Sequence, residues 1–450
     1  MTEHAGGGGT PRELVAGDWS FPTSLAFDHR GAVYVAESGL PFGGAPAGGR
    51  VWRLDPPAAG GGQDRRLLAD GLGVPVNGLA VHDGALYVSE GGHPGRISRL
   101  AVDGGTVEVL VDGLPGGADY QTNMVAVGPD GKLYFGQGAM TNSGVVGLDA
   151  FELGWLRRLP EGHDLPGLEV VLAGTNFETA DPRAATPGSA TTTGGFVSFG
   201  TPTRAGQRIP ARLPCTAAVL RCDLDGGNLE LVAWGLRNPF GLGFLPDGRL
   251  LAVDQGADER GSRPIGNAPD TLYEVRQGAW YGWPDFVAGD PVTHPGYRPT
   301  RGPAPTFLLT NHDELPPPER PLVRFPPHSA ATKFAVMPGG QLVVALFGDE
   351  VPLTAPSGPR AGRCAVRVDP ADWSVDPLEL GPFARPIDVG FHPLDQHLYV
   401  LDFGRFEMRP DAELLAEPGT GALWRIPATA AIAAGKRPVA WTSTMETPRW

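Results

Sequence analysis

Apolar and polar residues alternate along this 450-residue chain in short runs that are separated by turn residues. Runs of roughly four to eight residues with this period of two are typical of β-strands buried on one face. One unit recurs six times: an alternating strand, a tight turn, a second alternating strand and a glycine. The copies are PTSLAFDHRGAVYVAESG from Pro22, PVNGLAVHDGALYVSEGG from Pro75, QTNMVAVGPDGKLYFGQG from Gln121, NPFGLGFLPDGRLLAVDQG from Asn238, ATKFAVMPGGQLVVALFG from Ala331 and PIDVGFHPLDQHLYVLDFG from Pro386.

Further strands follow several of these hairpins. A third strand is predicted at GRVWRLD, GRISRLAVD, AVLRCDLD and ALWRIP, and a fourth at segments such as RRLLADGL and VEVLVDGL. Four antiparallel strands in each of six repeats are typical of a β-propeller. We therefore predict an all-β, six-bladed β-propeller that forms one domain over residues 1–450.

The two ends of the chain each supply part of one blade. The N-terminal segment RELVAGDW resembles a fourth strand without a blade of its own, whereas ALWRIP near the other end lacks a fourth strand. Pairing these two segments would close the ring and hide both sheet edges. The glycine-rich residues 1–10 are predicted to be flexible.

Two of the intervals between neighbouring repeats are much longer than the others. Equivalent positions are mostly about 50 residues apart, but 117 residues separate Ala126 from Gly243 and 92 separate Gly243 from Ala335. These gaps predict two long insertions, about residues 140–214 and 257–327, that flank the fourth blade. Loops of this length inside a compact domain are usually functional, so we expect the site beside this blade.

Composition and charge narrow the function classes. Gly (66) and Pro (47) are frequent enough to suggest disorder, yet 41% of the residues are hydrophobic and only 19% are charged, which favours a folded chain. A net charge of −14 opposes a phosphate-binding surface, so no nucleic-acid partner is expected. No apolar run approaches the ~20 residues that cross a membrane, and the N-terminus lacks the blocks of a signal peptide. The sequence as given therefore predicts a soluble protein without an export signal.

The three cysteines, Cys215, Cys222 and Cys364, form neither a metal-ligand pattern nor a disulfide framework. A Cys215–Cys222 bridge is one option, and buried thiols are the favoured one. None of the histidines has a helical or CxxC-type ligand spacing, so the sequence does not support a zinc site.

The fourth repeat carries residues with specific chemistry. Arg237 and Asn238 precede its first strand, and Gln255 follows its second strand, so all three should meet at one rim of the central channel. An arginine binds carboxylate through two parallel hydrogen bonds, while amides pair with carbonyl groups and ring nitrogens. Together these residues could hold a planar polyanion. The alternative is a purely structural role, in which Arg237 only connects loops by donating hydrogen bonds to their carbonyl groups.

This block, GLRNPFGLGFLPDGRLLAVDQG followed by PDTLYEV and YGWP, resembles the soluble quinoprotein glucose dehydrogenases and sorbosone dehydrogenases. These are six-bladed propellers that oxidise sugars with pyrroloquinoline quinone (PQQ) and calcium. The motif-level agreement lies in about residues 234–286. The resemblance implies a sugar or polyol substrate, an external electron acceptor, and a periplasmic or secreted location, which the missing signal peptide leaves open.

The resemblance also assigns roles to single residues. It implies that Arg237 and Asn238 contact the quinone, that Gln255 and Asp270 are further site residues, and that Arg385 lies near the cofactor. The carbonyls of Gly256 and Ala257 match the backbone oxygens that hold calcium against the quinone; hard oxygen ligands suit Ca²⁺, which would polarise the quinone for reduction. For Asp270, the alternative is a capped turn.

Two family residues have no direct match. The family uses a histidine before the third inner strand as general base, but here Tyr120 or Gln121 stands at that point. A tyrosine with a pKa near 10 is a poor base at neutral pH. The candidate bases are therefore Tyr120, Asp119 and His328, which precedes the fifth inner strand, unless the chain has lost the chemistry. The family lysine near the fifth blade is also unmatched, and Lys333 is the candidate substitute.

Two other functions remain open from the sequence. A metal-dependent hydrolase of the gluconolactonase kind would use Asn77, Asn123 and Asp388 as oxygen ligands in the channel, although Glu37 and Glu90 end outward-running strands and do not complete such a set. A non-catalytic propeller that binds a glycan or a protein is the third hypothesis, and the absent histidine is its main support.

Overall fold

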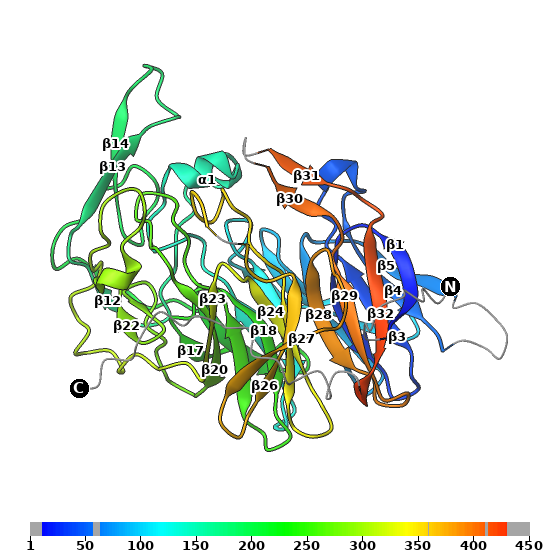
Figure 1. Ribbon diagram of the computed structural model, residues 1–450. Coiled ribbons are helices and arrows are strands. Elements are labelled where there is room, and N and C mark those ends of the chain that lie inside the picture. The colour runs from blue at the N-terminus through cyan, green and yellow to red at the C-terminus, as the bar shows by residue number, and fades with distance from the viewer. Residues whose placement is uncertain (1–10, 57–63, 359, 410–412, 430–450) are drawn as a thin grey trace.

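Six four-stranded antiparallel sheets make up the body of the protein. The computed structural model describes residues 11–56, 64–358, 360–409 and 413–429, so the predicted flexible segment 1–10 lies outside the described residues. The six sheets stand side by side around a central channel, with their strands running between the two faces of the ring (Figure 1). The predicted six-bladed β-propeller is confirmed.

Each blade takes its strands in chain order from the channel outwards. Blade 1 consists of β2 (Pro22–Phe27), β3 (Val33–Glu37), β4 (Gly49–Leu54) and β5 (Arg65–Leu72). Blade 2 consists of β6 (Val76–His82), β7 (Ala85–Glu90), β8 (Gly95–Ala101) and β9 (Glu108–Leu114). Blade 3 consists of β10 (Thr122–Val127), β11 (Lys132–Gln137), β16 (Ala218–Asp223) and β17 (Glu230–Trp234).

The remaining blades follow the same order. Blade 4 consists of β18 (Pro239–Phe244), β19 (Leu250–Asp254), β20 (Pro269–Val275) and β23 (Val323–Pro327). Blade 5 consists of β24 (Ala331–Val336), β25 (Leu342–Leu346), β26 (Cys364–Asp369) and β27 (Ser374–Leu378). Blade 6 consists of β28 (Pro386–Phe391), β29 (His397–Asp402), β32 (Gly421–Pro427) and, from the other end of the chain, β1 (Glu13–Trp19).

The pairing of β1 with β32 closes the ring, as predicted. The two strands are antiparallel, with Glu13 opposite Arg425 and Leu14 opposite Trp424. Arg425 and Glu13 also form an ion pair of 2.5 Å. The closure covers the outer edge of β32, and β1 becomes the outermost strand of blade 6, so the C-terminal strand has no edge left that could pair with another chain.

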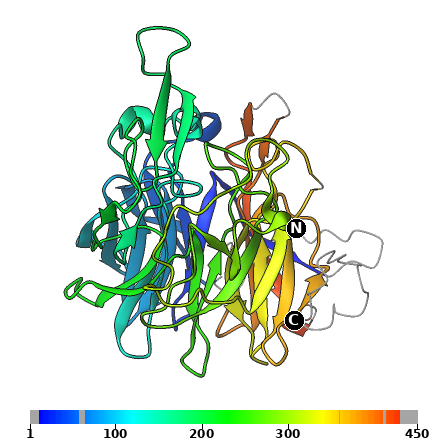
Figure 2. The same cartoon turned by 90° about the vertical axis from the view of Figure 1, so that its left-hand side faces the viewer.

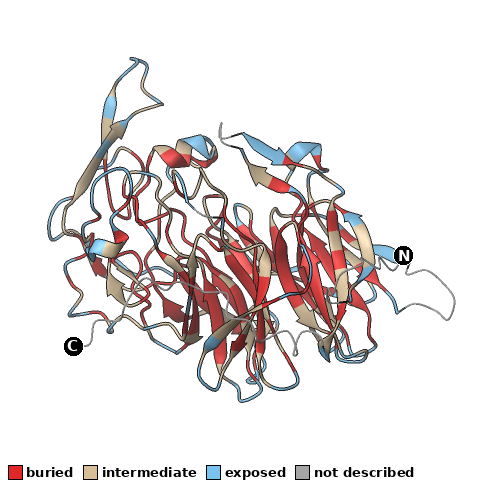
Figure 3. Ribbon diagram, in the orientation of Figure 1, coloured by how far each residue is buried: buried red, intermediate tan, exposed pale blue. Residues whose placement is uncertain are grey.

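The core lies between the blades and around the inner strands. The second strand of each blade is almost continuously buried, whereas the outermost strands and the turns carry most of the exposed positions (Figure 3). Seven apolar or small residues in β3, β7 and β25, for example, have at most 1% of their surface exposed: Val33, Val35, Ala36, Leu86, Val88, Val343 and Val344. Cys215 and Cys222 are buried free thiols, which confirms the favoured option, and Cys364 is a half-buried free thiol.

Every inner strand departs from regular pairing near its first residues. A register shift occurs close to the start of β2, β6, β10, β18, β24 and β28. A β-bulge re-aims the side chains next to it. Asn77, Asn123 and Lys333 lie within these irregular stretches, which brings polar side chains to the channel axis.

The loops that join second to third strands lie on one face of the ring, which we call the insertion face. This face carries α1 (Leu148–Glu152), the hairpin β13–β14 (Asn176–Ala180 and Ala190–Gly194) and the hairpin β30–β31 (Phe406–Met408 and Leu414–Ala416) (Figure 1). In the turned view, β13–β14 projects beyond the other loops (Figure 2). The remaining short elements are α2 (Trp155–Arg158), β12 (Val170–Val171), β15 (Arg208–Ile209), β21 (Phe286–Val287), β22 (Asp290–Pro291), η1 (Phe42–Gly44) and η2 (Pro295–Tyr297).

The structure places both long segments inside blades. The first joins β11 to β16 within blade 3, and the second contains β20 and β23, two strands of blade 4 itself. The segments pack on each other: Thr310 N donates to Val171 O (2.8 Å) and Ala173 N donates to Leu308 O (2.7 Å). Trp280 and Trp283 are buried in the same apolar cluster. Of the helices described, none has the length and apolar character to cross a membrane.

Candidate functional site

The predicted site residues of blade 4 meet at the channel rim on the insertion face. Arg237 and Asn238 lie directly before β18 and Gln255 lies directly after β19, so the hairpin brings them together. Asp254, the last residue of β19, accepts hydrogen bonds from Arg237 N (3.2 Å) and Asn238 N (2.7 Å). Burial raises the pKa of Asp254 to about 7.

Arg237 is bound on all sides by the protein itself. Its Nε donates to Asn142 O (2.9 Å), and its Nη2 donates to Asn142 Oδ1 (2.7 Å) and to Asp258 Oδ2 (3.0 Å). Its Nη1 donates to the carbonyls of Gln255 (3.2 Å) and Gly256, and Nη2 also donates to the Tyr120 hydroxyl. Only 4% of Arg237 is exposed. These contacts are those of a residue that ties loop carbonyls together.

A group of charged residues surrounds this arginine. We call Asp119, Tyr120, Asp149, Arg237, Asp258 and Arg260 the rim cluster. Arg260 forms ion pairs with Asp119 (2.8 Å), Asp149 (2.7 Å) and Asp258 (3.3 Å). Burial raises the pKa of Asp149 to about 6. The cluster therefore holds three carboxyl groups against two guanidinium groups in a largely dry environment.

Tyr120 lies in the middle of the rim cluster. Its ring is 4.4 Å from the Arg237 guanidinium carbon, and its hydroxyl accepts from Arg237 and from Arg260 Nη2 (3.1 Å). Burial nevertheless raises the pKa of this phenol further above its ordinary value of 10.0. Tyr120 therefore keeps its proton at neutral pH, and its contacts are those of a hydrogen-bonding partner of the two arginines.

His328 lies at the edge of the rim cluster. Its Nδ1 is 3.9 Å from Asp258 Oδ1, and 13% of its side chain is exposed. His328 and Ala330 both have positive φ (61° and 47°), in the tight turn before β24. Strained backbone of this kind often marks functional positions. Here it turns the imidazole towards Asp258 and the channel mouth.

Asp270 braces the turn that carries His328. Its Oδ2 accepts from Ser329 Oγ (3.1 Å) and Ala331 N (2.8 Å), and its Oδ1 accepts from Gly256 N (2.8 Å). Burial raises its pKa to about 6. Asp270 thus connects the loop after β19 to the turn before β24, and none of these partners belongs to a turn before the Tyr-Gly-Trp-Pro segment.

The rim amides form a chain of hydrogen bonds across four blades. Asn77 Nδ2 donates to Asn123 Oδ1 (3.4 Å), and Asn123 Nδ2 donates to Asn238 Oδ1 (2.8 Å). Asn238 Nδ2 then donates to Gln255 Oε1 (2.7 Å), and Gln255 Nε2 donates to Ala331 O (3.1 Å). Asn238, which the resemblance assigns to the quinone, and Gln255, which it gives as a further site residue, are therefore bound to each other and to their neighbours.

Lys333 occupies the channel below these amides. Its ammonium donates to Thr23 O (2.7 Å) and Asn77 O (2.6 Å) and lies 3.4 Å from Asp388 Oδ2. A cation of the chain itself thus stands among the oxygens that the hydrolase hypothesis assigns to a metal. No group of three or more His, Cys, Asp or Glu side chains could hold a metal ion in the part of the chain that the structure describes.

Arg385 serves a different pair of loops. Its guanidinium donates to Phe406 O (2.8 Å) and Asp349 O (2.7 Å) and lies 3.4 Å from Glu407 Oε2. Asp349 lies in the loop after β25 of blade 5, and Phe406 and Glu407 belong to β30, which follows β29 of blade 6. With 1% of its surface exposed, Arg385 links these two blades.

PQQ and calcium do not fit the rim as its side chains lie. The Gly256 carbonyl, one of the two proposed calcium ligands, faces the Arg237 guanidinium. A quinone carboxylate would also have to displace Asp258 from both arginines. The donor types match the cofactor, but the chain uses them itself.

Sequence reasoning missed Asp258, Arg260 and Glu350. The segment ADERGSR, directly after Gln255 and Gly256, carries two acids and two arginines in the predicted rim loop, and this was the available signal. Glu350 lies in the loop after β25, which contacts the rim loop where Glu259 N donates to Thr354 O (2.8 Å). Burial raises the pKa of Glu350 to about 6.

Comparison with solved structures gives the fold and a group of sugar-oxidising neighbours. The chain is similar to an oxidoreductase (glucose dehydrogenase) from Thermus thermophilus, with a TM-score of 0.54 and 19% identity over 93% of this chain and 100% of that one. It is similar to the PQQ domain of pyranose dehydrogenase from Coprinopsis cinerea (TM-score 0.54, 15% identity, 94% and 97% covered). It is also similar to the soluble aldose sugar dehydrogenase of Escherichia coli (TM-score 0.51, 14% identity, 93% and 99% covered).

These similarities extend over nearly the whole length of each neighbour and show the six-bladed propeller fold. No family model matches the chain, and no curated protein sequence matches it. At 14–19% identity the activities of the neighbours do not transfer with the fold.

Proposed function

We propose that the protein is a propeller oxidoreductase that oxidises a hydroxyl group of a sugar or a related polyol, at the rim of the insertion face. The observation that carries this proposal is the pair His328 and Asp258, 3.9 Å apart, beside the arginines of the rim cluster. Three neighbours of the same fold that are named sugar dehydrogenases support the same substrate class.

His328 acts as the general base. It takes the proton of the substrate hydroxyl as the carbon–hydrogen bond breaks and the hydride passes to a two-electron acceptor, and Asp258 stabilises the imidazolium that forms. Arg237 and Arg260 hold Asp258 in place, so their role is to position the carboxylate. Tyr120 keeps its proton and orients the two guanidinium groups.

The proposal also concerns the identity of the hydride acceptor. PQQ with calcium is the acceptor that the motif resemblance implies, and an external acceptor would reoxidise it. Because the rim does not fit these groups as its side chains lie, we assign no step to them. Their binding would require Arg237 to release Gly256 O and Asp258.

A second function is favoured by one specific observation. The polar groups assigned to the cofactor are bound within the protein, as Arg237, Asn238 and Gln255 show. A rim whose polar groups are already bound suits a propeller that recognises a glycan or a protein through its loops without chemistry.

Dye-linked activity assays separate the two proposals. The purified protein is incubated with PQQ and Ca²⁺, then tested with an artificial electron acceptor on a panel of sugars and polyols, with direct titration of PQQ binding alongside. We expect dye reduction that His328→Gln lowers at least about 100-fold, the usual weight of a general base. Tyr120→Phe should retain most of the activity, and His29→Gln, at an exposed position, serves as control.

The contrary results are equally specific. Activity that survives His328→Gln but falls with Tyr120→Phe would make Tyr120 the base. If the protein neither binds PQQ nor reduces the dye on any compound of the panel, the oxidoreductase proposal fails and the binding propeller remains.

A further inference from the structure

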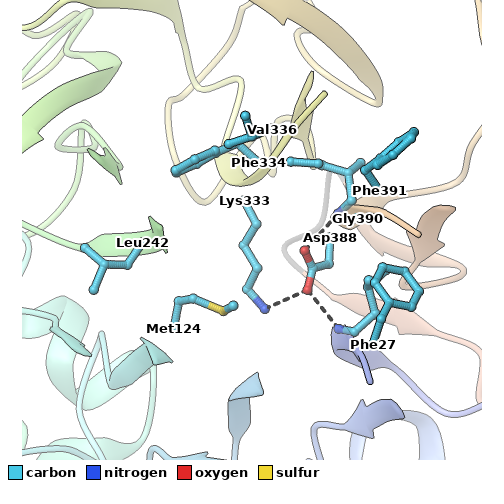
Figure 4. Close-up of a pocket in the computed structure, with 12 residues that line it drawn as sticks. Phe27, Met124, Leu242, Lys333, Phe334, Val336, Asp388, Gly390 and Phe391 are labelled. Carbon is cyan, nitrogen blue, oxygen red and sulfur yellow. Dashed lines mark hydrogen bonds and ion pairs between the residues drawn. The ribbon is translucent and has the colours of Figure 1, made fainter. Parts of the chain in front are cut away.

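A second cavity lies at the other end of the channel, away from the rim. It has a volume of about 210 Å³ and is formed by the inner strands of blades 1, 3, 4, 5 and 6. We call it the lower cavity. Lys333 and Asp388 line its inner end, where the two charged side chains point towards each other (Figure 4). The rim proposal uses none of its walls.

The walls of the lower cavity are apolar and rich in rings. They are formed mainly by Phe27, Met124, Leu242, Phe334, Val336 and Phe391 (Figure 4). The three phenylalanines are half-buried, so part of each ring faces solvent. Aromatic rings favour edge-to-face or offset contacts with another ring, and a thioether such as that of Met124 packs well against ring edges.

The inner end offers one kind of polar contact. The Lys333 ammonium has its three hydrogens directed at Thr23 O, Asn77 O and Asp388 Oδ2, so it has none left for a ligand. Asp388 Oδ2 also accepts from Ser24 Oγ (3.1 Å) and Leu25 N (2.8 Å). Among the described residues, Asp388 Oδ1 accepts only from Val389 N (2.8 Å). A carboxylate oxygen can accept a second bond, so this atom suits a hydrogen-bond donor.

Charge limits the ligand further. Lys333 and Asp388 together carry no net charge, whether the proton lies on one or on the other. A charged ligand would therefore bring an unbalanced charge into an apolar cavity, which is costly. Size limits it as well: an apolar cavity of about 150 Å³ can take benzene, so about 210 Å³ suits one ring with small substituents.

We propose that the lower cavity is a binding site for an uncharged phenol, with the ring between Phe27, Phe334 and Phe391 and the hydroxyl donating to Asp388. The site is separate from the rim and independent of the proposed oxidoreductase activity. Ring packing supplies the affinity, and the second hydrogen bond that Asp388 Oδ1 can accept supplies the preference for a hydroxyl group.

Three ligands of nearly equal shape test the proposal. Calorimetry and saturation-transfer NMR on the full-length protein compare p-cresol, p-xylene, which replaces the hydroxyl by a methyl group, and p-toluate, which is an anion. We expect p-cresol to bind about tenfold or more tightly than p-xylene, the usual effect of one hydrogen bond to a charged acceptor. No binding of p-toluate is expected.

Two further measurements locate the site. Val336→Trp fills the cavity and should abolish p-cresol binding, whereas Leu213→Trp, at a position that is 49% exposed in the first long segment, should not. Photolabelling with 4-azidophenol needs no variant and should mark peptides with Met124, Phe334, Val336 or Phe391, with excess p-cresol as competitor. His328→Gln should leave p-cresol binding unchanged.

Several outcomes would overturn the proposal. Equal affinity for p-cresol and p-xylene would remove the role of Asp388, and stronger binding of p-toluate would remove the charge argument. Labels confined to other peptides, or labels that p-cresol does not compete away, would remove the site itself. The absence of p-cresol binding at millimolar concentration would do the same.

Discussion

Replacement of Arg237 by alanine distinguishes a residue that ties loops together from one that waits for a ligand. The guanidinium contacts the 141–143 turn, the loop after β19 and Tyr120, and 4% of the residue is exposed. Arg237→Ala removes all of these contacts at once. It leaves the carbonyls of Gln255 and Gly256 without this donor and Asp258 with Arg260 as its remaining arginine partner.

The expected loss of stability follows from these contacts. Removal of one partner of a buried ion pair costs about 3–5 kcal/mol, because the other charge and its hydrogen-bonding groups stay buried. The entropy of unfolding is about 2.1 cal/mol/K per residue, or about 0.9 kcal/mol/K for a chain of this length. The melting temperature should therefore fall by about 3–6 °C.

Differential scanning calorimetry on the protein without added ligand measures this shift. Arg276→Ala is the matched control, because Arg276 also pairs with two carboxylates, Glu274 and Glu319, but its side chain is 57% exposed. Exposed ion pairs contribute about 0–1 kcal/mol, so the control should shift the melting temperature by about 1 °C or less.

One result would refute the reasoning. If Arg237→Ala melts within about 1 °C of the wild-type protein, its contacts contribute little to the fold, and the rim is soft enough to rearrange around a cofactor. If it then also loses PQQ binding, the arginine belongs to a ligand site. A large shift in melting temperature supports the role of a loop tie.

Three further predictions concern stability. Asp254 holds its proton up to about pH 7 in the folded protein but only to about pH 3.9 when unfolded, so between these values the folded state binds more protons. The free energy of unfolding should therefore fall as pH rises from 5 to 8. Urea titrations across this range should show a free energy of unfolding that depends less on pH for Asp254→Asn. Deletion of residues 1–20 removes β1 and exposes β32, so size-exclusion chromatography should show aggregation that deletion of residues 1–10 does not cause. Gly241→Ala should lower the melting temperature by several degrees, because its new Cβ would collide with the Thr332 carbonyl oxygen in the next blade. The control Gly358→Ala meets open space and should melt like the wild type. Equal melting temperatures of the two variants would show that blades 4 and 5 are less tightly packed than described.

The repeat explains why so much of the fold could be predicted from the sequence. Each copy specifies its own hairpin through alternation and turn residues, and these are local properties. The closure of the ring by β1 and β32 also followed, because one end had a strand too many and the other a strand too few. The boundaries of the long segments could not be predicted from the sequence, because β20 and β23 lie within Gly- and Pro-rich sequence that resembles a loop.

The acidic residue that ends several of the second strands has a structural role that was not predicted from the sequence. Several second strands end in an acid, and its carboxylate accepts backbone N–H groups from the loop before the inner strand or a neighbouring loop. Glu37 accepts from Ser20 N (2.6 Å), Glu90 from Gly73 N (2.6 Å), and Asp402 from Ala384 N and Arg385 N (both 2.8 Å). These acids stabilise the insertion face.

The sequence by itself determined the number of blades, the closure and the place of the Arg237, Asn238 and Gln255 group, because each depends on short-range pattern and on position within the repeat. Only the tertiary structure decided what these side chains do. Bulges at the start of the inner strands bring Asn77, Asn123 and Lys333 to the axis, and each polar group there binds the nearest partner from another blade. Asn142 and Tyr120 lie 95 and 117 residues from Arg237 in the sequence, so these partners follow from the packing of the ring, which no local pattern encodes.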